Sequence, residues 1–430
     1  MKKISYPKRS TWEELLKRPT QTVDEIELTV NEIFNEVRIK GDEAVRKYTS
    51  LFDGVSLESF VVSGPEIAAA SDTVSEELKK AIGLAKSNIE SFHNAQKTKK
   101  VEVETSPGVL CWQEKRPIGK IGLYIPGGTA PLFSTILMLA IPAKLAGCRE
   151  IILCTPPDKQ GNVNPAILYT ASLCGVTQIL KIGGIQAIAA MTFGTASVPK
   201  VYKIFGPGNQ FVTVAKQLST RYGVAIDMPA GPSELLVAAD DSADPAFVAS
   251  DLLSQAEHGK DSQVILVTTS KGMLTKVEEE IEKQLELLPR KEIAEHAINN
   301  SKLILVKSDE EAINIINEYG PEHFILCVDN EHTYLENLEN AGSVFIGNYT
   351  PESAGDYASG TNHTLPTNGY AKNYSGVNLD TFMKAMTFQK ITATGIQNIG
   401  NAIEEMAAAE GLQAHKNAVS LRLDKLKKSK

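Results

Sequence analysis

The sequence has few cysteines, no long apolar run and no apolar leader, and each shortage excludes a class of protein. Five cysteines in 430 residues, without C-x-x-C spacing, indicate thiols in a reducing compartment rather than a disulfide scaffold. The most apolar segment, 132–147, contains Pro142 and Lys144 and is too short to span a bilayer. The N-terminal MKKISYPKRS lacks the apolar stretch of a signal peptide. We therefore expect a cytoplasmic protein without a membrane partner.

An excess of positive charge and a standard dinucleotide fingerprint are also missing. The net charge of −8 argues against a nucleic-acid groove and against binding to an anionic membrane surface. No G-x-G-x-x-G follows a predicted strand, so a standard dinucleotide site is not visible. Cys154 ends a predicted strand and has no basic neighbour, which favours a buried structural thiol over a nucleophile.

The chain is too long for one ordinary core, and its pattern changes along its length. Residues 10–100 are helical in character, whereas from Gly119 onward short apolar strands alternate with Gly/Pro turns and helices. This pattern predicts an α/β fold with two Rossmann-like parallel-sheet domains and small helical segments at both ends. The expected division is an N-terminal arm (1–22), a first domain (23–123 and 234–379), a second domain (124–233) and a C-terminal segment (380–430).

Several loops that are rich in glycine and polar groups are candidates for ligand binding. Parallel sheets bind ligands at the carboxyl ends of their strands, where we expect these loops to lie. GPGN (206–209) leads into a predicted helix and could bind a phosphate through backbone N–H groups, or it could be a tight structural turn. The full set is YIPGG, IGGIQ, FGPGN, PAGPSE and SAGDYASGTNH.

Some of the seven histidines are candidate metal ligands. Gln255 and His258, in DLLSQAEHGK, would project from one face of a last helical turn. With Asp356 and His415 they would give two imidazoles, a carboxylate and an amide, a set that suits zinc. A surface hydrogen-bonding pair is the alternative for Gln255 and His258. Three histidines lie in ordinary helical stretches, and the first is expected on the surface: His93, His296 and His332.

Glu322 and His323 form a candidate acid–base pair. They follow Gly320-Pro321 at the start of a predicted strand. An imidazole with a pKa near neutrality can accept and return protons, and a neighbouring carboxylate can orient it or activate water. The alternative is a solvated pair at a strand edge.

Seven motifs, in order, are similar to those of the histidinol dehydrogenase family. The resemblance runs from about residue 25 to residue 420, and several motifs are long and unusual. The motifs are YIPGGTAPLFST, FGPGN, DMPAGPSE, DLLSQAEHG, YGPEHF, ASGTNHTLPT and EGLQAH.

The resemblance implies an NAD-dependent oxidation of L-histidinol, through an enzyme-held aldehyde, to L-histidine. It implies that Glu322 and His323 are the catalytic pair. Zinc, one ion per subunit, would be bound by Gln255, His258, Asp356 and His415. NAD contacts match Tyr124, Gln186 and Asn209. Substrate contacts match Ser233, Gln255, His258, His323, Asp356, His363, Glu410 and His415.

The resemblance also implies a homodimer in which the C-terminal segment completes the partner's site, so that Glu410 and His415 would act in the other subunit. Three rival functions remain open at this point. A related enzyme could oxidise another polar alcohol with the same residues, and a zinc hydrolase would use Glu322 but leave YIPGG, IGGIQ and FGPGN without a role. A non-catalytic binding protein with this fold is the third.

Overall fold

The computed structural model describes residues 1–19, 23–127, 131–229 and 231–428. Gly128 of the YIPGG loop, Ala230 of the PAGPSE loop and the predicted boundary at residue 22 lie outside these ranges. The chain divides into two compact units. The larger comprises Met1–Gln96 and Ile118–Thr381, and the smaller comprises Lys97–Pro117 and Phe382–Lys430.

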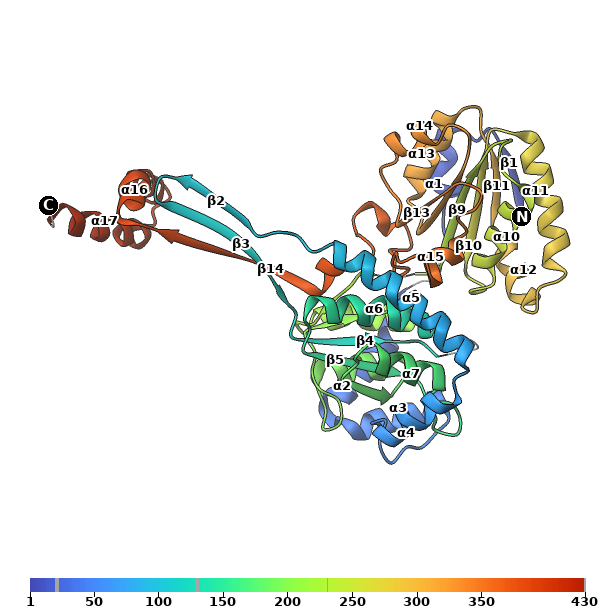
Figure 1. The fold of residues 1–430 in the computed structure, drawn as a ribbon, viewed down its shortest axis with the longest axis horizontal. Helices are drawn as coiled ribbons and strands as arrows, with labels where there is room; N and C mark the ends of the chain where they lie inside the picture. Colours follow the sequence, from blue (N-terminus) through green and yellow to red (C-terminus); the bar gives the residue numbers. More distant parts are fainter. Residues whose placement is uncertain (20–22, 128–130, 230, 429–430) are drawn as a thin grey trace. The chain divides into compact units, whose positions relative to one another are not determined.

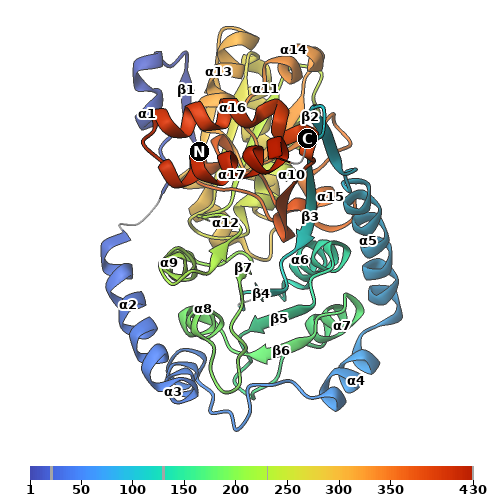
Figure 2. The ribbon, with the colours of Figure 1, turned by 90° about the vertical axis from the view of Figure 1, so that its left-hand side faces the viewer.

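One parallel sheet of the larger unit has five strands in the order β6-β5-β4-β7-β8. Helices α6 and α7 cover one face and α8 and α9 the other (Figure 2), as in a doubly wound sheet. The strands are β4 (Lys120–Tyr124), β5 (Glu150–Thr155), β6 (Gln178–Lys181), β7 (Lys203–Phe205) and β8 (Ala225–Ile226). The helices are α6 (Phe133–Ala146), α7 (Pro165–Leu173), α8 (Gly184–Phe193) and α9 (Gln210–Thr220).

The N-terminal helices pack against this five-stranded sheet and its helices. Val30, Phe34 and Val45 share one buried cluster with Leu180 and Ile188. The predicted division grouped 23–123 with the other sheet, and the packing of these helices differs from that grouping; the division into domains stays a prediction. The helices are α2 (Val23–Lys40), α3 (Asp42–Asp53), α4 (Gly64–Thr73) and α5 (Glu76–Ala95).

The second parallel sheet of the larger unit has six strands in the order β1-β11-β10-β9-β12-β13 (Figure 1). Its side chains alternate between two cores: Leu235 and Val237 face α10, α11 and α12, whereas Leu236 and Ala238 face α1 and α13. The strands are β1 (Lys2–Ser5), β9 (Glu234–Ala239), β10 (Gln263–Thr268), β11 (Lys302–Leu305), β12 (His323–Cys327) and β13 (Ser343–Ile346). The helices are α1 (Trp12–Leu15), α10 (Pro245–Ala256), α11 (Lys271–Leu285), α12 (Lys291–Asn299), α13 (Asp309–Tyr319), α14 (Glu331–Asn337) and α15 (Glu352–Tyr357).

Several helices begin where the sequence supplies a capping side chain. Asn164, Asp244 and Ser308 each accept a hydrogen bond from a backbone N–H in the first turn of the helix that follows. Pro165 and Pro245 occupy first helical positions, where a missing N–H costs nothing. The predicted parallel-sheet fold is confirmed, and its helix starts are encoded locally.

The smaller unit is a three-stranded antiparallel sheet with two helices, in the order β14-β3-β2. The C-terminal segment was expected to be helical, and for its first part this was wrong, because Met383–Ile391 pairs with β3 over nine residues. Met, Lys, Ala and Gln dominate this stretch and favour a helix, so strand pairing overrides local propensity here. The elements are β2 (Val101–Ser106), β3 (Val109–Pro117), β14 (Met383–Ile391), α16 (Ala393–Ala409) and α17 (Gln413–Lys428).

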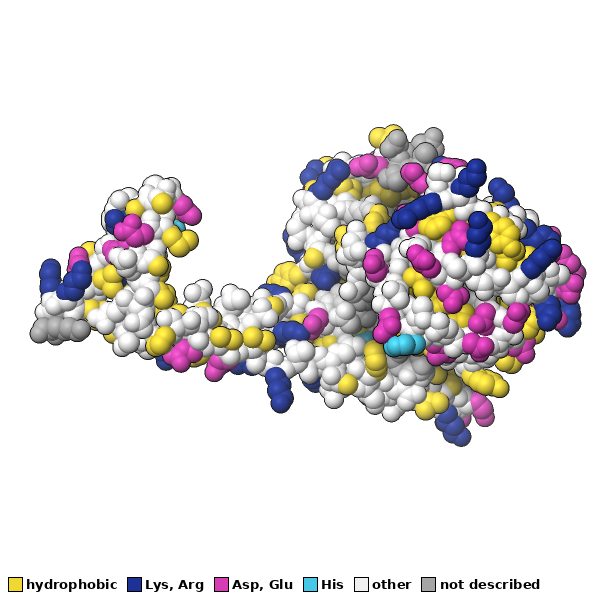
Figure 3. All heavy atoms as spheres, turned by 90° about the horizontal axis from the view of Figure 1, so that it is seen from above, with side chains coloured by type: hydrophobic (Ala, Val, Ile, Leu, Met, Phe, Trp, Pro, Cys, Tyr) yellow, Lys and Arg dark blue, Asp and Glu magenta, His cyan; other side chains and the backbone are white. Residues whose placement is uncertain are grey.

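In Figure 3 the basic and acidic side chains of the larger unit are interspersed over the visible face. Among the residues that the structure describes, no helix is both long and apolar enough to cross a membrane.

Candidate active site

The Glu322–His323 pair lies at the start of a central strand and is buried. Gly320 ends α13 in the left-handed conformation, with φ of +59°, and the chain then enters β12 at His323. Strand β12 pairs with β9 on one side and β13 on the other, and Glu322 and His323 are 6% and 4% exposed. The alternative of a solvated pair at a sheet edge is therefore wrong.

This pair lies at the amino ends of the six-stranded sheet. His323 is the first residue of β12 and Glu234 the first of β9, and Gln255 lies in the last turn of α10, just before β10. For this sheet the expectation that ligand loops lie at the carboxyl ends of strands was wrong. The helices return the chain to the amino edge, so residues at helix ends meet strand starts there. In the five-stranded sheet Tyr124 does end its strand.

His323 is surrounded by carboxylates. Its Nδ1 is 3.5 Å from Glu352 Oε1 and 3.7 Å from Glu322 Oε2, and its Nε2 is 3.7 Å from Asp356 Oδ1. Burial opposes the charged imidazole, but the carboxylates outweigh it and raise the pKa of His323 to about 10. Nδ1 lies 3.3 Å from the carbonyl oxygen of Glu234, to which it can only donate, and Nε2 has no hydrogen-bond partner among the described residues. Nε2 is thus the nitrogen available to a substrate.

Two of these carboxyls have unusual acidities. Burial raises the pKa of Glu322 to about 8, although nearby His323 lowers it. Burial likewise raises the pKa of Glu352 to about 8. The backbone N–H of Glu234 donates to Glu322 Oε2 at 2.8 Å, which fixes one oxygen of that carboxyl. Both groups therefore exchange protons near neutral pH.

Glu352 is a residue of this site that was not predicted from the sequence. Its carboxylate, together with His323 and Asp356, forms a group whose ligand atoms lie within 4.8 Å of one another, close enough to hold a metal ion. The signal was present, because Glu352 and Asp356 are four residues apart and so share one face of α15.

The structure brings three of the four predicted metal ligands near this cluster. The Gln255 amide is fully buried against Glu352 and His323, and donation from its NH₂ to Glu352 leaves its oxygen available as a ligand. His258 is partly accessible to solvent. The protein around its imidazole lowers its pKa, although the nearby carboxylate of Asp356 raises it. Burial alone would raise the pKa of Asp356, but the nearby imidazoles of His323, His363 and His258 outweigh burial and lower it. Gln255 lies in the last turn of α10 as predicted, but His258 follows the helix, which ends at Ala256.

The remaining predicted ligand and one substrate contact lie in the smaller unit. His415 is in α17 and Glu410 follows α16, and both side chains are exposed.

His363 and Ser233 belong to the larger unit with the pair. His363 Nδ1 donates to the carbonyl of Asp356 at 2.9 Å, and its Nε2 is 3.2 Å from Thr135 Oγ1. Burial lowers the pKa of His363. Ser233 is half-buried and directly precedes Glu234.

His93 is not a surface residue, contrary to expectation. It is completely buried, with Nδ1 2.9 Å from the Ile89 carbonyl and Nε2 3.2 Å from Asn362 Nδ2. Asn362 also donates to the Met138 carbonyl at 2.6 Å. His93 therefore supports the segment that carries His363.

The three predicted NAD residues line one cavity of about 1510 Å³. This volume is ample for a ligand of cofactor size. Tyr124 and Gln186 are buried, and neither amide atom of Gln186 has a partner among the described residues. The Asn209 side chain caps α9 by accepting from Val212 N at 3.1 Å. Cys154, also near this end of the sheet, is fully buried, as expected.

A buried ion pair supports the loop that carries Asn209. Lys216 Nζ contacts Asp227 Oδ1 at 2.5 Å and donates to the Gly206 carbonyl at 2.7 Å, while Gly206 N donates to Asp227 Oδ2 at 2.8 Å. Gly206 has φ of +122°, and a Cβ there would clash with the carbonyl of Tyr124. The GPGN loop thus requires glycine at position 206, and both a structural turn and phosphate binding stay open predictions.

Comparisons with known proteins identify the family of the chain. The family model for histidinol dehydrogenase matches residues 16–423. Histidinol dehydrogenase of Bacteroides thetaiotaomicron is 61% identical over 427 residues, covering 99% of this chain and 100% of that protein. The enzyme of the same name from Escherichia coli K12 is 55% identical over 417 residues, covering 96% of this chain and 95% of that protein.

Solved structures give the same result. The crystal structure of histidinol dehydrogenase from Elizabethkingia anophelis is 57% identical, with a TM-score of 0.97 and 99% of both chains covered. An acetylating aldehyde dehydrogenase from Geobacillus thermoglucosidasius, 14% identical with a TM-score of 0.50, covers 88% of this chain and 94% of its own and shares only the fold. The chain therefore belongs to the histidinol dehydrogenase family and is an NAD-dependent oxidoreductase.

Proposed function

We propose that the chain catalyses the last step of histidine biosynthesis, a two-stage oxidation of L-histidinol through histidinal to L-histidine. The observation that supports it best is the buried His323, whose Nε2 has no hydrogen-bond partner among the described side chains, next to Glu322. Glu322 and His323, called the catalytic pair from here on, supply the two proton acceptors that the two stages need.

The residues around Asp356 fit a zinc ion. His258 has a lowered pKa, Asp356 is ionised at neutral pH, and Gln255 offers an amide oxygen, so this set is neutral imidazole, carboxylate and amide. Zn²⁺, when bound there, supplies a charge that offsets the carboxylates near His323 and open positions that orient the substrate's amine and imidazole. His415 would be the fourth ligand.

The cavity that contains Tyr124, Gln186 and Asn209 fits NAD. The unpartnered buried amide of Gln186 supports this assignment, because a buried polar group without a partner is costly unless a ligand satisfies it. NAD, when bound, supplies the hydride acceptor for each oxidation.

The catalytic pair would act in sequence. In the first stage, His323 accepts the hydroxyl proton at Nε2 as the carbinol carbon loses a hydride to NAD. This role requires the neutral imidazole, so the charge of a cation bound near the carboxylates would have to lower the pKa of His323 from the value of about 10 that they impose. In the second, Glu322 removes a proton from a water molecule, which adds to the aldehyde carbon to form a hydrate. That hydrate then loses a second hydride to NAD and a hydroxyl proton to His323, which gives the carboxylic acid. A pKa of about 8 suits Glu322 to this task, since a base acts best when its pKa is near the working pH.

We further propose that Ser233 and His363 form hydrogen bonds with the substrate and that Glu410 binds its ammonium group. The smaller unit exposes apolar side chains, such as Val101, Val103 and Met386, along its sheet. These exposed apolar side chains support a homodimer in which Glu410 and His415 complete the partner's site. We also propose that the enzyme is cytoplasmic.

The experiment that tests this function is the number of NADH formed per L-histidinol, with and without a metal chelator. We expect two NADH, none after chelation, and recovery with zinc. One NADH would contradict the role of Glu322, and none would favour another polar alcohol as substrate or a hydrolase. Metal content, measured by atomic absorption, should fall in H258N and D356N.

A further inference from the structure

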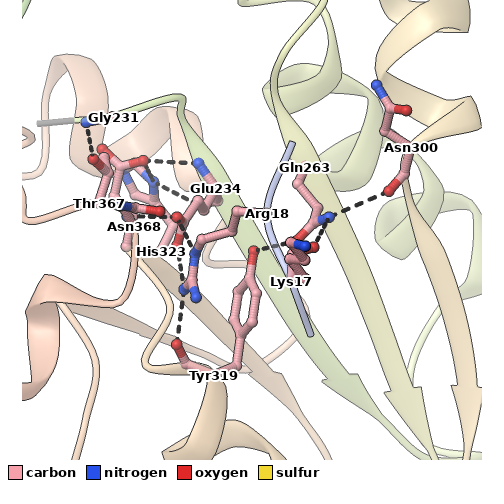
Figure 4. A network of polar contacts seen from close by, with 11 residues as sticks. Lys17, Arg18, Gly231, Glu234, Gln263, Asn300, Tyr319, His323, Thr367 and Asn368 are labelled. Carbon is pink, nitrogen blue, oxygen red and sulfur yellow. Dashed lines mark hydrogen bonds and ion pairs between the residues drawn. The ribbon is translucent and has the colours of Figure 1, made fainter. Parts of the chain in front are cut away.

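Arg18, in the N-terminal arm, lies within a buried polar network beside the catalytic pair (Figure 4). Its Nε and Nη2 donate to the two carboxylate oxygens of Glu234, at 2.5 and 2.8 Å. The side chains of Arg18 and Glu234 are 14% and 2% exposed. Two parallel bonds to one carboxylate require the planar guanidinium, which a lysine cannot replace.

The main chain of Glu234 contacts both members of the catalytic pair. Its N–H donates to Glu322 Oε2 at 2.8 Å, and its carbonyl oxygen lies 3.3 Å from His323 Nδ1. The position of this peptide segment thus determines where the Glu322 carboxyl lies and which nitrogen of His323 faces the substrate. A side chain that holds Glu234 in place therefore also holds the Glu322 carboxyl and the His323 ring in place.

Arg18 also holds the segment that precedes the catalytic pair. Its Nη2 donates to the Tyr319 carbonyl at 2.7 Å, and its guanidinium carbon lies 4.0 Å from the centroid of the Tyr319 ring. Tyr319 ends α13, three residues before Glu322. One guanidinium therefore connects the two segments whose relative position defines the site.

The arm does not depend on Arg18 for its attachment. Strand β1 pairs in parallel with β11 from Lys2 to Ser5, and Trp12 is buried and donates to the Pro7 carbonyl. The Lys17 carbonyl accepts from Gln263 Nε2 at 3.2 Å. These contacts would remain after loss of the Arg18 side chain, so its network has a purpose beyond holding the arm.

We propose that Arg18 is a positioning residue for the oxidation, holding Glu234 and Tyr319 so that Glu322 and His323 keep their working geometry. The inference rests on the proposed function, because it uses the roles given there to the catalytic pair. A displacement of about 1 Å at a reacting group can lower a rate about a hundredfold. Loss of the guanidinium should therefore reduce kcat and leave the KM values nearly unchanged.

The test compares R18M and R18K with K17M, a matched change at the neighbouring exposed position. We expect R18M to lower kcat for histidinal oxidation by about tenfold to a hundredfold, more than it lowers kcat for histidinol oxidation. R18K keeps the charge but cannot form the two parallel bonds to Glu234. It should therefore also lower kcat for histidinal oxidation more than kcat for histidinol oxidation, but by a smaller factor than R18M. It also provides a folded variant if R18M folds poorly. K17M should match wild type.

The ratio of kcat for histidinal oxidation to kcat for histidinol oxidation distinguishes a positioning role from a loss of folded protein. A smaller folded fraction lowers both oxidations equally, so an unchanged ratio in R18M and R18K would overturn the inference. So would a loss confined to KM.

A double-mutant cycle then separates this inference from the proposed function. If Arg18 acts on histidinal oxidation mainly through Glu322, adding R18M to E322Q should lower histidinal oxidation further only by the smaller factor that R18M imposes on histidinol oxidation through His323. Fully additive losses would refute the role of Arg18, whichever stage Glu322 serves. An E322Q enzyme with equal losses in both stages would instead refute the proposed role of Glu322.

Discussion

In the proposed mechanism the carboxyl of Glu322 acts in only one of the two stages. E322Q keeps the size of the side chain but removes the base. We expect kcat for histidinal oxidation to fall by about a hundredfold or more, and kcat for histidinol oxidation to fall by less than about tenfold. Steady-state NADH formation from each substrate, supplied separately, measures both values.

E318Q is the matched control, because Glu318 is an exposed carboxylate four residues earlier, on α13. It should leave both rates unchanged. Equal losses from E322Q in the two stages would show that Glu322 does not activate water.

Asp53 has a burial cost that depends on pH. It lines the cavity, its Oδ2 has no hydrogen-bond partner among the described residues, and burial raises its pKa from 3.8 to about 6. The folded state therefore favours the protonated acid. The unfolded state releases this proton at lower pH than the folded state does. The stability that Asp53 contributes to the folded state is therefore fully present below about pH 4 and is lost as the pH rises through 6.

We accordingly expect D53N to gain stability over wild type at pH 8 and little at pH 4. The full shift corresponds to about 3 kcal/mol, and solvent screening of this partly exposed group reduces the gain to about 1 kcal/mol. Urea unfolding at both pH values measures it, with D72N on an exposed helical position as the control. A gain that is the same at pH 4 and pH 8 would contradict the explanation by burial.

At the scale of elements, the loop between β7 and α9 depends on the buried pair of Lys216 and Asp227. Both side chains are at most 2% exposed. K216M would leave the Asp227 carboxylate buried without its cation, a change that costs about 3 kcal/mol. We expect lower stability in urea unfolding and weaker NAD binding by calorimetry, because the Gly206 carbonyl also loses its donor.

The double variant K216M/D227N tests this cause. It removes both charges, so it should recover part of the lost stability while the loop stays less well held. If the double variant is as unstable as the sum of its parts, the ion pair is not the reason.

The elements that the sequence predicts are those whose local signals agree with their packing. Strands β9 and β12 are short apolar runs between turn residues, and both occur where expected. Strand β14 was missed because its pairing with β3 comes from a distant part of the chain. Strand β1 was missed for the same reason, since it joins β11 about 300 residues later.

Individual residues of the site could be predicted from the sequence, but the residues that contact them in the folded chain could not. Glu322 and His323 were singled out, yet only the tertiary structure shows that Glu352 and the main chain of Glu234 contact them. The importance of Arg18 has no local signal, because its partners lie more than 200 residues away in sequence.

At the scale of the whole molecule, the predicted site is divided between two compact units. Asp356 and the catalytic pair belong to the larger unit, and Glu410 and His415 belong to the smaller. Both residues of the smaller unit are exposed in the single chain. A homodimer that shares its sites would give these exposed polar residues a function.

Heterodimers of two inactive variants show whether His415 acts in its own subunit's site or in the partner's site. H323N lacks the base and H415N lacks a metal ligand, so each homodimer should be nearly inactive. If His415 acts in the partner's site, the heterodimer of H323N and H415N contains one site with both histidines and one site with neither. Co-expression with two different tags, followed by purification through both, should then give about half of the wild-type turnover. If His415 serves its own subunit, each site lacks one histidine, and the purified heterodimer should be as inactive as its parents.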